Sequence, residues 1–166
     1  VDVEQVGFRL AGEFDLAGVE AAWQRVIDRH AILRTSFLWE GLEHPLQAVH
    51  RQVALPVVRH DWRGGSADDR GRQLDAFLRA DRARGFVLSQ APLVRLALIR
   101  CADQEYKFVL TRHHMVLDRW SRALVLKDFI ATYDALVAGR KPALGTARQY
   151  SDYIDWLGRQ DAASAE

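Results

Sequence analysis

Two adjacent histidines, His113 and His114, carry the densest chemical information in this sequence. They stand where an apolar run ends and a helical pattern begins, a junction at which exposed side chains and unpaired helix amides can converge. Histidine is well suited to exchange protons near neutral pH, although either residue taken alone is also typical of a hydrogen-bonded core position. Because neighbouring residues of an extended segment point to opposite faces, we expect the two rings to have different roles.

Asp118 and Ser121 follow the histidines at a spacing that permits more than one interpretation. A nucleophilic serine would need a sharp turn of the Gly-x-Ser-x-Gly type, and Ser121 instead falls inside the first turn of the expected helix. We therefore interpret Ser121 as structural and Asp118 as the N-cap of that helix. A metal site is not expected, because the sequence has no cysteine pair and its other histidines are scattered.

The composition predicts one globular domain without a strong overall charge. The 166 residues carry a formal net charge of +1 and 49% of them are hydrophobic, so we expect neither a nucleic-acid partner nor a membrane partner. The single cysteine, Cys101, cannot form an intramolecular disulfide and closes an apolar stretch. We expect a buried structural thiol and a cytoplasmic protein.

Strands alternate with long helices along the sequence, and the histidine pair lies where a buried strand ends and a helix begins. Apolar patterns predict strands over 3–10, 33–39, 46–49, 55–58, 93–101 and 106–111, of which the last two should be adjacent central strands. Helical spacing predicts a helix capped by Asp15, a surface helix over 67–84, a helix over 120–137 and a final helix over 149–159. The expected fold is an α/β or α+β layered domain in which helices cover a mixed sheet.

The expected buried stripes follow from the same spacing. In the first helix the stripe contains Leu16, Val19, Trp23, Val26 and Ile27. In the helix over 120–137 it contains Leu124, Phe129, Ile130, Tyr133 and Val137.

Residues 113–121, HHMVLDRWS, resemble the His-His-x-x-x-Asp-Gly signature of condensation domains of nonribosomal peptide synthetases. Further segments are similar to motifs of this family, in the same order and at similar spacing: RHAILRTSF at 29–37, APLVRLALIR at 91–100 and YSDYIDW at 150–156. The resemblance implies that residues 1–166 are an amino-terminal lobe, with the upstream start and the carboxy-terminal lobe absent. It also implies a half-domain of the chloramphenicol-acetyltransferase-like superfamily.

The resemblance implies roles for individual residues as well. His114, the second histidine of the signature, would be catalytic and face a tunnel in which two substrates meet, with His113 and Asp118 in supporting positions. In the family an arginine commonly holds the signature aspartate, and motif position makes Arg34 the candidate, with Arg29 behind it.

Residue 119 is an arginine where the signature has glycine. A side chain there fills space beside His114 that glycine would leave open. Arg119 could turn into solvent, block the tunnel or contact an anionic ligand. Together with Trp120 and Ser121, it is expected to line or gate the tunnel.

The implied reaction is amide formation between an acyl or peptidyl thioester on one carrier protein and an aminoacyl amine on another. The substrates would arrive on phosphopantetheine arms of peptidyl or acyl carrier proteins, with no cofactor bound directly to this chain. His114 could act as a general base or as a hydrogen-bonding positioner of the amine.

Other functions stay open at the level of sequence. One is a catalytically silent condensation-like module that docks a carrier protein or a tailoring enzyme, and another is an epimerisation or acyltransferase relative. Cyclisation is disfavoured, because paired aspartates replace the histidines in that branch of the family.

Overall fold

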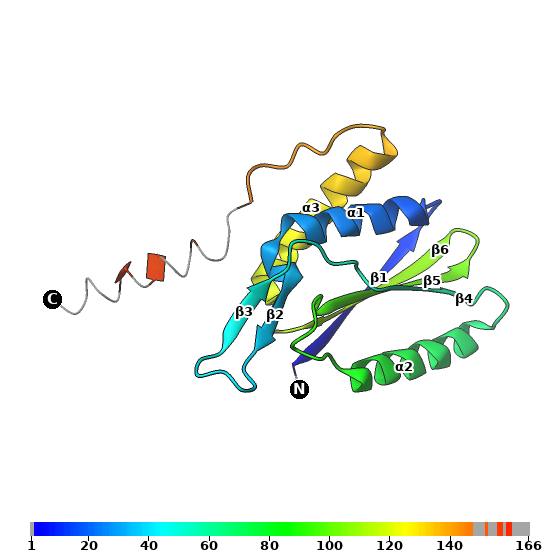
Figure 1. The fold of residues 1–166 in the computed structure, drawn as a ribbon. Coiled ribbons are helices and arrows are strands. Elements are labelled where there is room, and N and C mark those ends of the chain that lie inside the picture. Colours follow the sequence, from blue (N-terminus) through cyan, green and yellow to red (C-terminus); the bar gives the residue numbers. More distant parts are fainter. Residues whose placement is uncertain (1, 148–151, 153–155, 158, 161–166) are drawn as a thin grey trace.

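The computed structural model describes residues 2–147, 152, 156–157 and 159–160 (Figure 1). The helix expected over 149–159 and the motif at 150–156 lie outside the described residues, apart from isolated positions. In chain order the elements are β1 (Val3–Ala11), α1 (Leu16–Arg29), the 3-10 turn η1 (Ala31–Arg34), β2 (Thr35–Leu38), β3 (Leu46–Val49), β4 (Val57–Asp61), α2 (Ala67–Arg84), β5 (Val94–Ala102), β6 (Glu105–His113) and α3 (Arg119–Val137).

The main sheet is mixed, as expected, with the strand order β1-β6-β5-β4, and β2 pairs with β3 in a separate hairpin. β6 runs antiparallel to both β1 and β5, whereas β4 runs parallel to β5. The central strands β5 and β6 are the adjacent apolar pair that the sequence predicted. In the β1–β6 register Val3 lies opposite His113, so the beginning of β1 meets the histidine pair.

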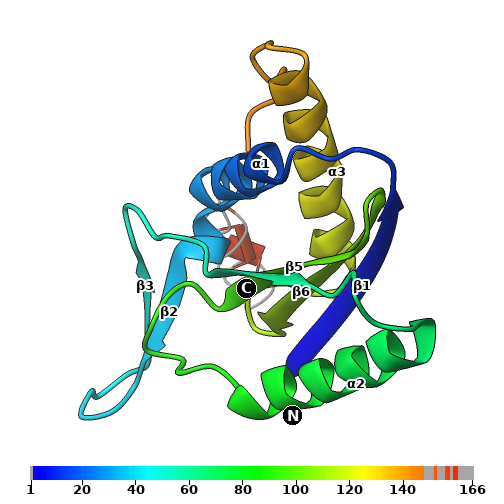
Figure 2. The same cartoon turned by 90° about the vertical axis from the view of Figure 1, so that its right-hand side faces the viewer.

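Helices α1 and α3 cover one face of this sheet and α2 covers the other (Figure 2). The larger core lies beneath α1 and α3, where Trp23 stacks on Phe129 with the ring centroids 4.6 Å apart. The smaller core lies beneath α2, whose narrow apolar stripe packs against a buried cluster that contains Cys101. Burial raises the pKa of the Cys101 thiol, which is consistent with a structural role.

Local capping signals explain where the helices begin. Asp15 accepts a hydrogen bond from the backbone N–H of Ala17 at 3.0 Å, as expected for the N-cap of α1. Ser66 and Asp69 form a capping box at the start of α2, whose bounds are those predicted. In the described part of the chain, no helix is both long enough and apolar enough to span a membrane.

Some boundaries and one buried stripe differ from the expectation. The strand expected from residue 33 begins at Thr35, because η1 buries Leu33 in a 3-10 turn. The strand expected from residue 55 begins after Pro56, which has no backbone N–H to donate to a strand ladder. In α3, three residues expected to be buried are exposed: Leu124, Ile130 and Val137. Apolar residues occur on most sides of this helix, so spacing alone does not select its buried face.

A buried carboxylate attaches α2 to the sheet. Asp81, only 7% exposed, accepts hydrogen bonds from Arg95 Nε at 2.6 Å, Thr111 Oγ1 at 2.6 Å and Gln5 Nε2 at 3.0 Å. Burial alone would raise the pKa of Asp81, but these hydrogen bonds outweigh burial and the pKa is lowered. The sheet face beneath α2 is therefore fixed by an ion pair as well as by apolar contacts.

Candidate active site

The histidine pair lies where backbone segments from three parts of the chain meet. His113 ends β6, and its N–H donates to the carbonyl oxygen of Leu93, just before β5, at 2.9 Å. The N–H of His114 donates to the carbonyl oxygen of Asp2, just before β1, at 2.7 Å. The two bonds run to residues that precede the strands on either side of β6, and they fix the backbone from which each ring projects.

His113 is buried, with 8% of its surface exposed. Its Nδ1 accepts a hydrogen bond from the N–H of Met115 at 3.3 Å, and its ring lies edge-on to Phe86. Burial is the main reason that the pKa of His113 is lowered, and the neighbouring His114 adds to the effect while Asp2 opposes it. This ring is held neutral and stabilises the turn after β6.

His114 has the opposite environment. Its side chain is 55% exposed, and its Nδ1 lies 3.0 Å from Oε1 of Glu4, a residue of β1. The two histidines therefore differ in exposure and in partners, as their adjacent positions predicted.

Glu4 also contacts Arg112, and sequence reasoning gave neither residue a role. The side chain of Arg112 is 1% exposed; its Nη2 pairs with Oε2 of Glu4, and its Nε donates to the carbonyl oxygen of Leu117 at 3.0 Å. Burial lowers the pKa of the Arg112 guanidinium, and the carboxylate of Glu4 opposes this shift. An arginine inside an apolar strand was an available signal, but its partner depends on the β1–β6 register, which pairs Glu4 with Arg112.

Asp118 caps α3, and Ser121 is its partner. Asp118 Oδ1 accepts from the backbone N–H of Ser121 at 2.7 Å and also from the Ser121 hydroxyl. These bonds lower the pKa of Asp118. The hydroxyl of Ser121 is thus bonded to the cap and not to a histidine, which agrees with the structural interpretation of both residues.

Residues 3–166 match the model of the condensation domain. The chain belongs to the condensation-domain family. Chondramide synthase cmdD of Chondromyces crocatus is 39% identical over 166 residues, covering 100% of this chain and 4% of the relative. Bacitracin synthase 3 of Bacillus licheniformis is 35% identical over 163 residues, covering 98% of this chain and 3% of the relative. This condensation-domain chain thus spans only a small part of the length of these relatives.

Solved structures show the same fold. The starter condensation domain of rhizomide synthetase RzmA matches with a TM-score of 0.83 and 24% identity, over 96% of this chain and 38% of that one. The X-domain from teicoplanin biosynthesis matches with a TM-score of 0.81 and 28% identity, over 99% of this chain and 35% of that one. The expected half-domain of the chloramphenicol-acetyltransferase-like type, with a mixed sheet and covering helices, is confirmed.

The arginine expected to hold the aspartate of the condensation-domain signature does not contact it. Arg34 donates instead to the carbonyl oxygens of His50 and Arg51, which follow β3, and Arg29 pairs with Asp128 at 2.9 Å. Arg34 lies in η1, which turns it toward the hairpin, while Asp118 is already bonded to its own helix. The pairing inferred from motif position is therefore corrected.

Arg119 and Trp120 open α3 beside the histidines of this condensation domain. Arg119 is exposed and has a negative φ, like every non-glycine residue that the structure describes, so its backbone does not require the glycine of the signature. Trp120 is 83% exposed. Both side chains are accessible, and their part in lining or gating a tunnel stays a prediction.

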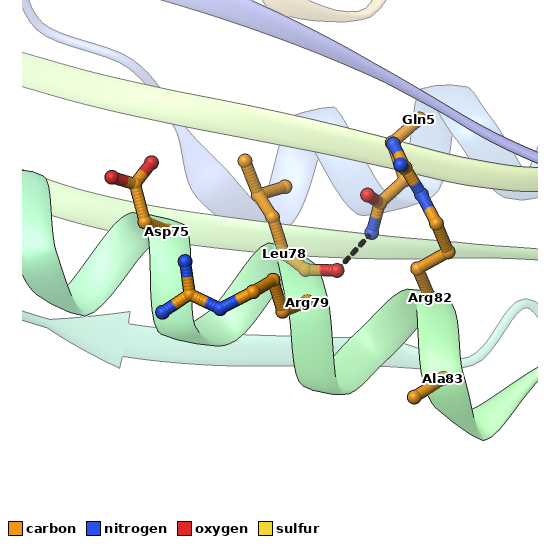
Figure 3. Close-up of a pocket in the computed structure, with 6 residues that line it drawn as sticks. All are labelled: Gln5, Asp75, Leu78, Arg79, Arg82 and Ala83. Atoms are coloured by element: carbon orange, nitrogen blue, oxygen red, sulfur yellow. Dashed lines mark hydrogen bonds between the residues drawn. The ribbon is translucent and has the colours of Figure 1, made fainter.

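A surface pocket of about 430 Å³ lies between β1 and α2, lined by Gln5, Asp75, Leu78, Arg79, Arg82 and Ala83 (Figure 3). Gln5 donates from Nε2 to the carbonyl oxygen of Leu78 at 3.1 Å. Because Glu4 and Gln5 are neighbours on a strand, they point to opposite faces, and the sheet separates this pocket from His114. Within the described ranges, no three His, Cys, Asp or Glu residues gather closely enough to hold a metal ion.

Proposed function

We propose that this chain supplies the histidine-bearing lobe of an active site that forms amide bonds in nonribosomal peptide synthesis. The observation that carries the proposal is His114, an exposed ring at the end of a buried strand, fixed by Asp2 through its backbone and by Glu4 through its side chain. The family to which the chain belongs supports the same chemistry.

In the proposed reaction an amine nitrogen attacks the carbonyl carbon of an acyl or peptidyl thioester. The C–N bond forms, the C–S bond breaks, and the proton lost by nitrogen ends on the released thiol. His114 would take this proton during attack or hold the amine by a hydrogen bond. His113 and Asp118 would support it by fixing the turn and the start of α3.

Both substrates would come on the phosphopantetheine arms of carrier proteins, without a cofactor bound to this chain. The two synthases to which the chain is similar are much longer, since the chain covers 4% of one and 3% of the other. We propose that a carboxy-terminal lobe, outside residues 1–166, completes the tunnel.

The test is amide formation by the full-length parent domain with loaded donor and acceptor carriers. Substitution His114→Ala should lower the rate about 10²- to 10⁴-fold, the usual contribution of a positioned proton-transfer group. His44→Ala, in the exposed segment between β2 and β3, is the matched control and should keep the rate. A His114→Ala domain that condenses as fast as wild type would contradict the proposal.

A docking module is the second candidate, and Arg119 is the observation that favours it, since it stands where the signature has glycine. A solved structure described as the complex of the X-domain and OxyB from teicoplanin biosynthesis is 28% identical to this chain. In the same assay, a native domain without activity that gains it on Arg119→Gly would support docking. Activity in the native domain would support catalysis.

A further inference from the structure

We propose that Glu4 is a positioning residue for His114: its carboxylate, itself anchored by Arg112, keeps the imidazole proton on Nδ1 and leaves the lone pair of Nε2 for the substrate amine. This inference rests on the proposed catalytic role of His114 and adds to it a residue from a distant part of the chain.

The side of the ring that carries hydrogen follows from the contact between Glu4 and Nδ1 of His114. Oε2 of Glu4 faces the guanidinium of Arg112, the arrangement of a carboxylate ion, and a carboxylate only accepts hydrogen bonds. A bare Nδ1 would set its lone pair against those of Oε1 at 3.0 Å, so this contact favours hydrogen on Nδ1. A neutral imidazole carries hydrogen on one nitrogen alone, so Nε2 of His114 is left as the acceptor.

Arg112 gives the carboxylate a fixed position. Its side chain is almost completely buried, and its Nε is tied to the carbonyl oxygen of Leu117 at 3.0 Å. Glu4 lies directly opposite Arg112 in the β1–β6 ladder. Since Glu4 and Arg112 belong to paired strands, the buried guanidinium gives the carboxylate of Glu4 a partner at a fixed place beside His114.

A second ion pair between β1 and β6 serves for comparison, because its carboxylate does not contact a histidine among the residues that the structure describes. Arg9 Nε lies 3.2 Å from Glu105 Oε1 at the other end of β1 and β6, and Arg9 is largely exposed. There the glutamate contacts no histidine in the described part of the chain. Glu105 is therefore a matched control for Glu4, because it is also a strand carboxylate paired with an arginine across the same ladder.

The first measurement is the tautomer of His114 from imidazole ¹⁵N chemical shifts in the parent domain. Wild type should show hydrogen on Nδ1, and Glu4→Val should lose this preference, whereas Glu105→Val should keep it. Glu4→Val alone leaves the buried charge of Arg112 unpaired, so the double substitution Glu4→Val and Arg112→Met is included to preserve the fold.

The second measurement is amide formation by the same variants. Removing the orienting carboxylate should lower kcat about tenfold to a hundredfold with KM for the loaded carriers unchanged, because Glu4 acts through His114. A folded double variant that keeps either the Nδ1 tautomer or the wild-type kcat overturns the proposal. A His114→Ala domain with full activity overturns the proposed function and with it this role, and the tautomer data separate the two failures.

Discussion

At the scale of single residues, two neighbouring histidines at the end of β6 have unlike environments. His113 is enclosed by the turn and by Phe86, whereas His114 faces outward and contacts a carboxylate. Burial makes the ring of His113 resist protonation, because charging it would cost desolvation energy that the nearby carboxylate of Asp2 only partly offsets. His113 therefore has a structural role, whereas the ring of His114 is accessible for chemistry.

Stability should depend on the protonation of His113. Its pKa is lowered in the folded chain, so the unfolded chain binds the proton more readily and the free energy of unfolding falls as pH drops below about 6.5. Substitution His113→Asn should make that pH dependence shallower in urea denaturation. The control is the exposed His44→Asn, which should keep the wild-type slope; equal slopes in all three proteins would contradict the prediction.

At the scale of elements, the attachment of α2 depends on one carboxylate. Asp81 is bonded to Arg95 of β5, to Thr111 of β6 and to Gln5 of β1, so a single helix residue contacts three strands. Asp81 should therefore be difficult to replace, since its removal would leave the buried guanidinium of Arg95 without a partner.

Replacing Asp81 by alanine should destabilise the fold by about 3–5 kcal/mol, the cost of leaving a buried charge without its partner. The double substitution Asp81→Leu and Arg95→Met should recover most of that loss, as measured by urea denaturation. Asp75→Ala, on the exposed side of the same helix, should change stability by less than about 0.5 kcal/mol. A single Asp81→Ala variant as stable as wild type would show that the ion pair contributes nothing.

Features of these elements that depend on residues close together in the chain were predicted from the sequence. The capped starts of α1 and α3 and the bounds of α2 follow from local signals, because a capping side chain and its helix are neighbours in the chain. The position of Arg34 could not be predicted, since it depends on where η1 directs a side chain. Glu4 and Arg112 were missed because the register of two strands far apart in sequence decides which residues face each other.

At the scale of the whole molecule, apolar surface is exposed beside the histidine pair. Trp120 and Leu124 lie one helical turn apart on α3 and are 83% and 64% exposed, and Met115, in the turn before α3, is exposed as well. Contiguous apolar surface of this kind is typical of a face that another protein segment covers.

We expect residues 1–166 on their own to self-associate through this face. Sedimentation velocity over a concentration series should show a rising average mass for wild type, and the double substitution Trp120→Ser and Leu124→Ser should shift the chain toward monomer. The control replaces two exposed apolar residues elsewhere, Val58→Ser and Val87→Ser, and should behave as wild type. A wild-type chain that stays monomeric at every concentration would contradict the prediction.

The alignment of β1 with β6 has a consequence for protein engineering. Asp2 and Glu4 hold a histidine that lies more than a hundred positions later in the chain, and the alternation of strand faces would put Val3 or Gln5 in place of Glu4 after a one-residue slip. A chimera whose junction falls between β1 and β6 would combine the carboxylate of one parent with the histidine of another. Recombination boundaries that keep both strands from one parent preserve the contact.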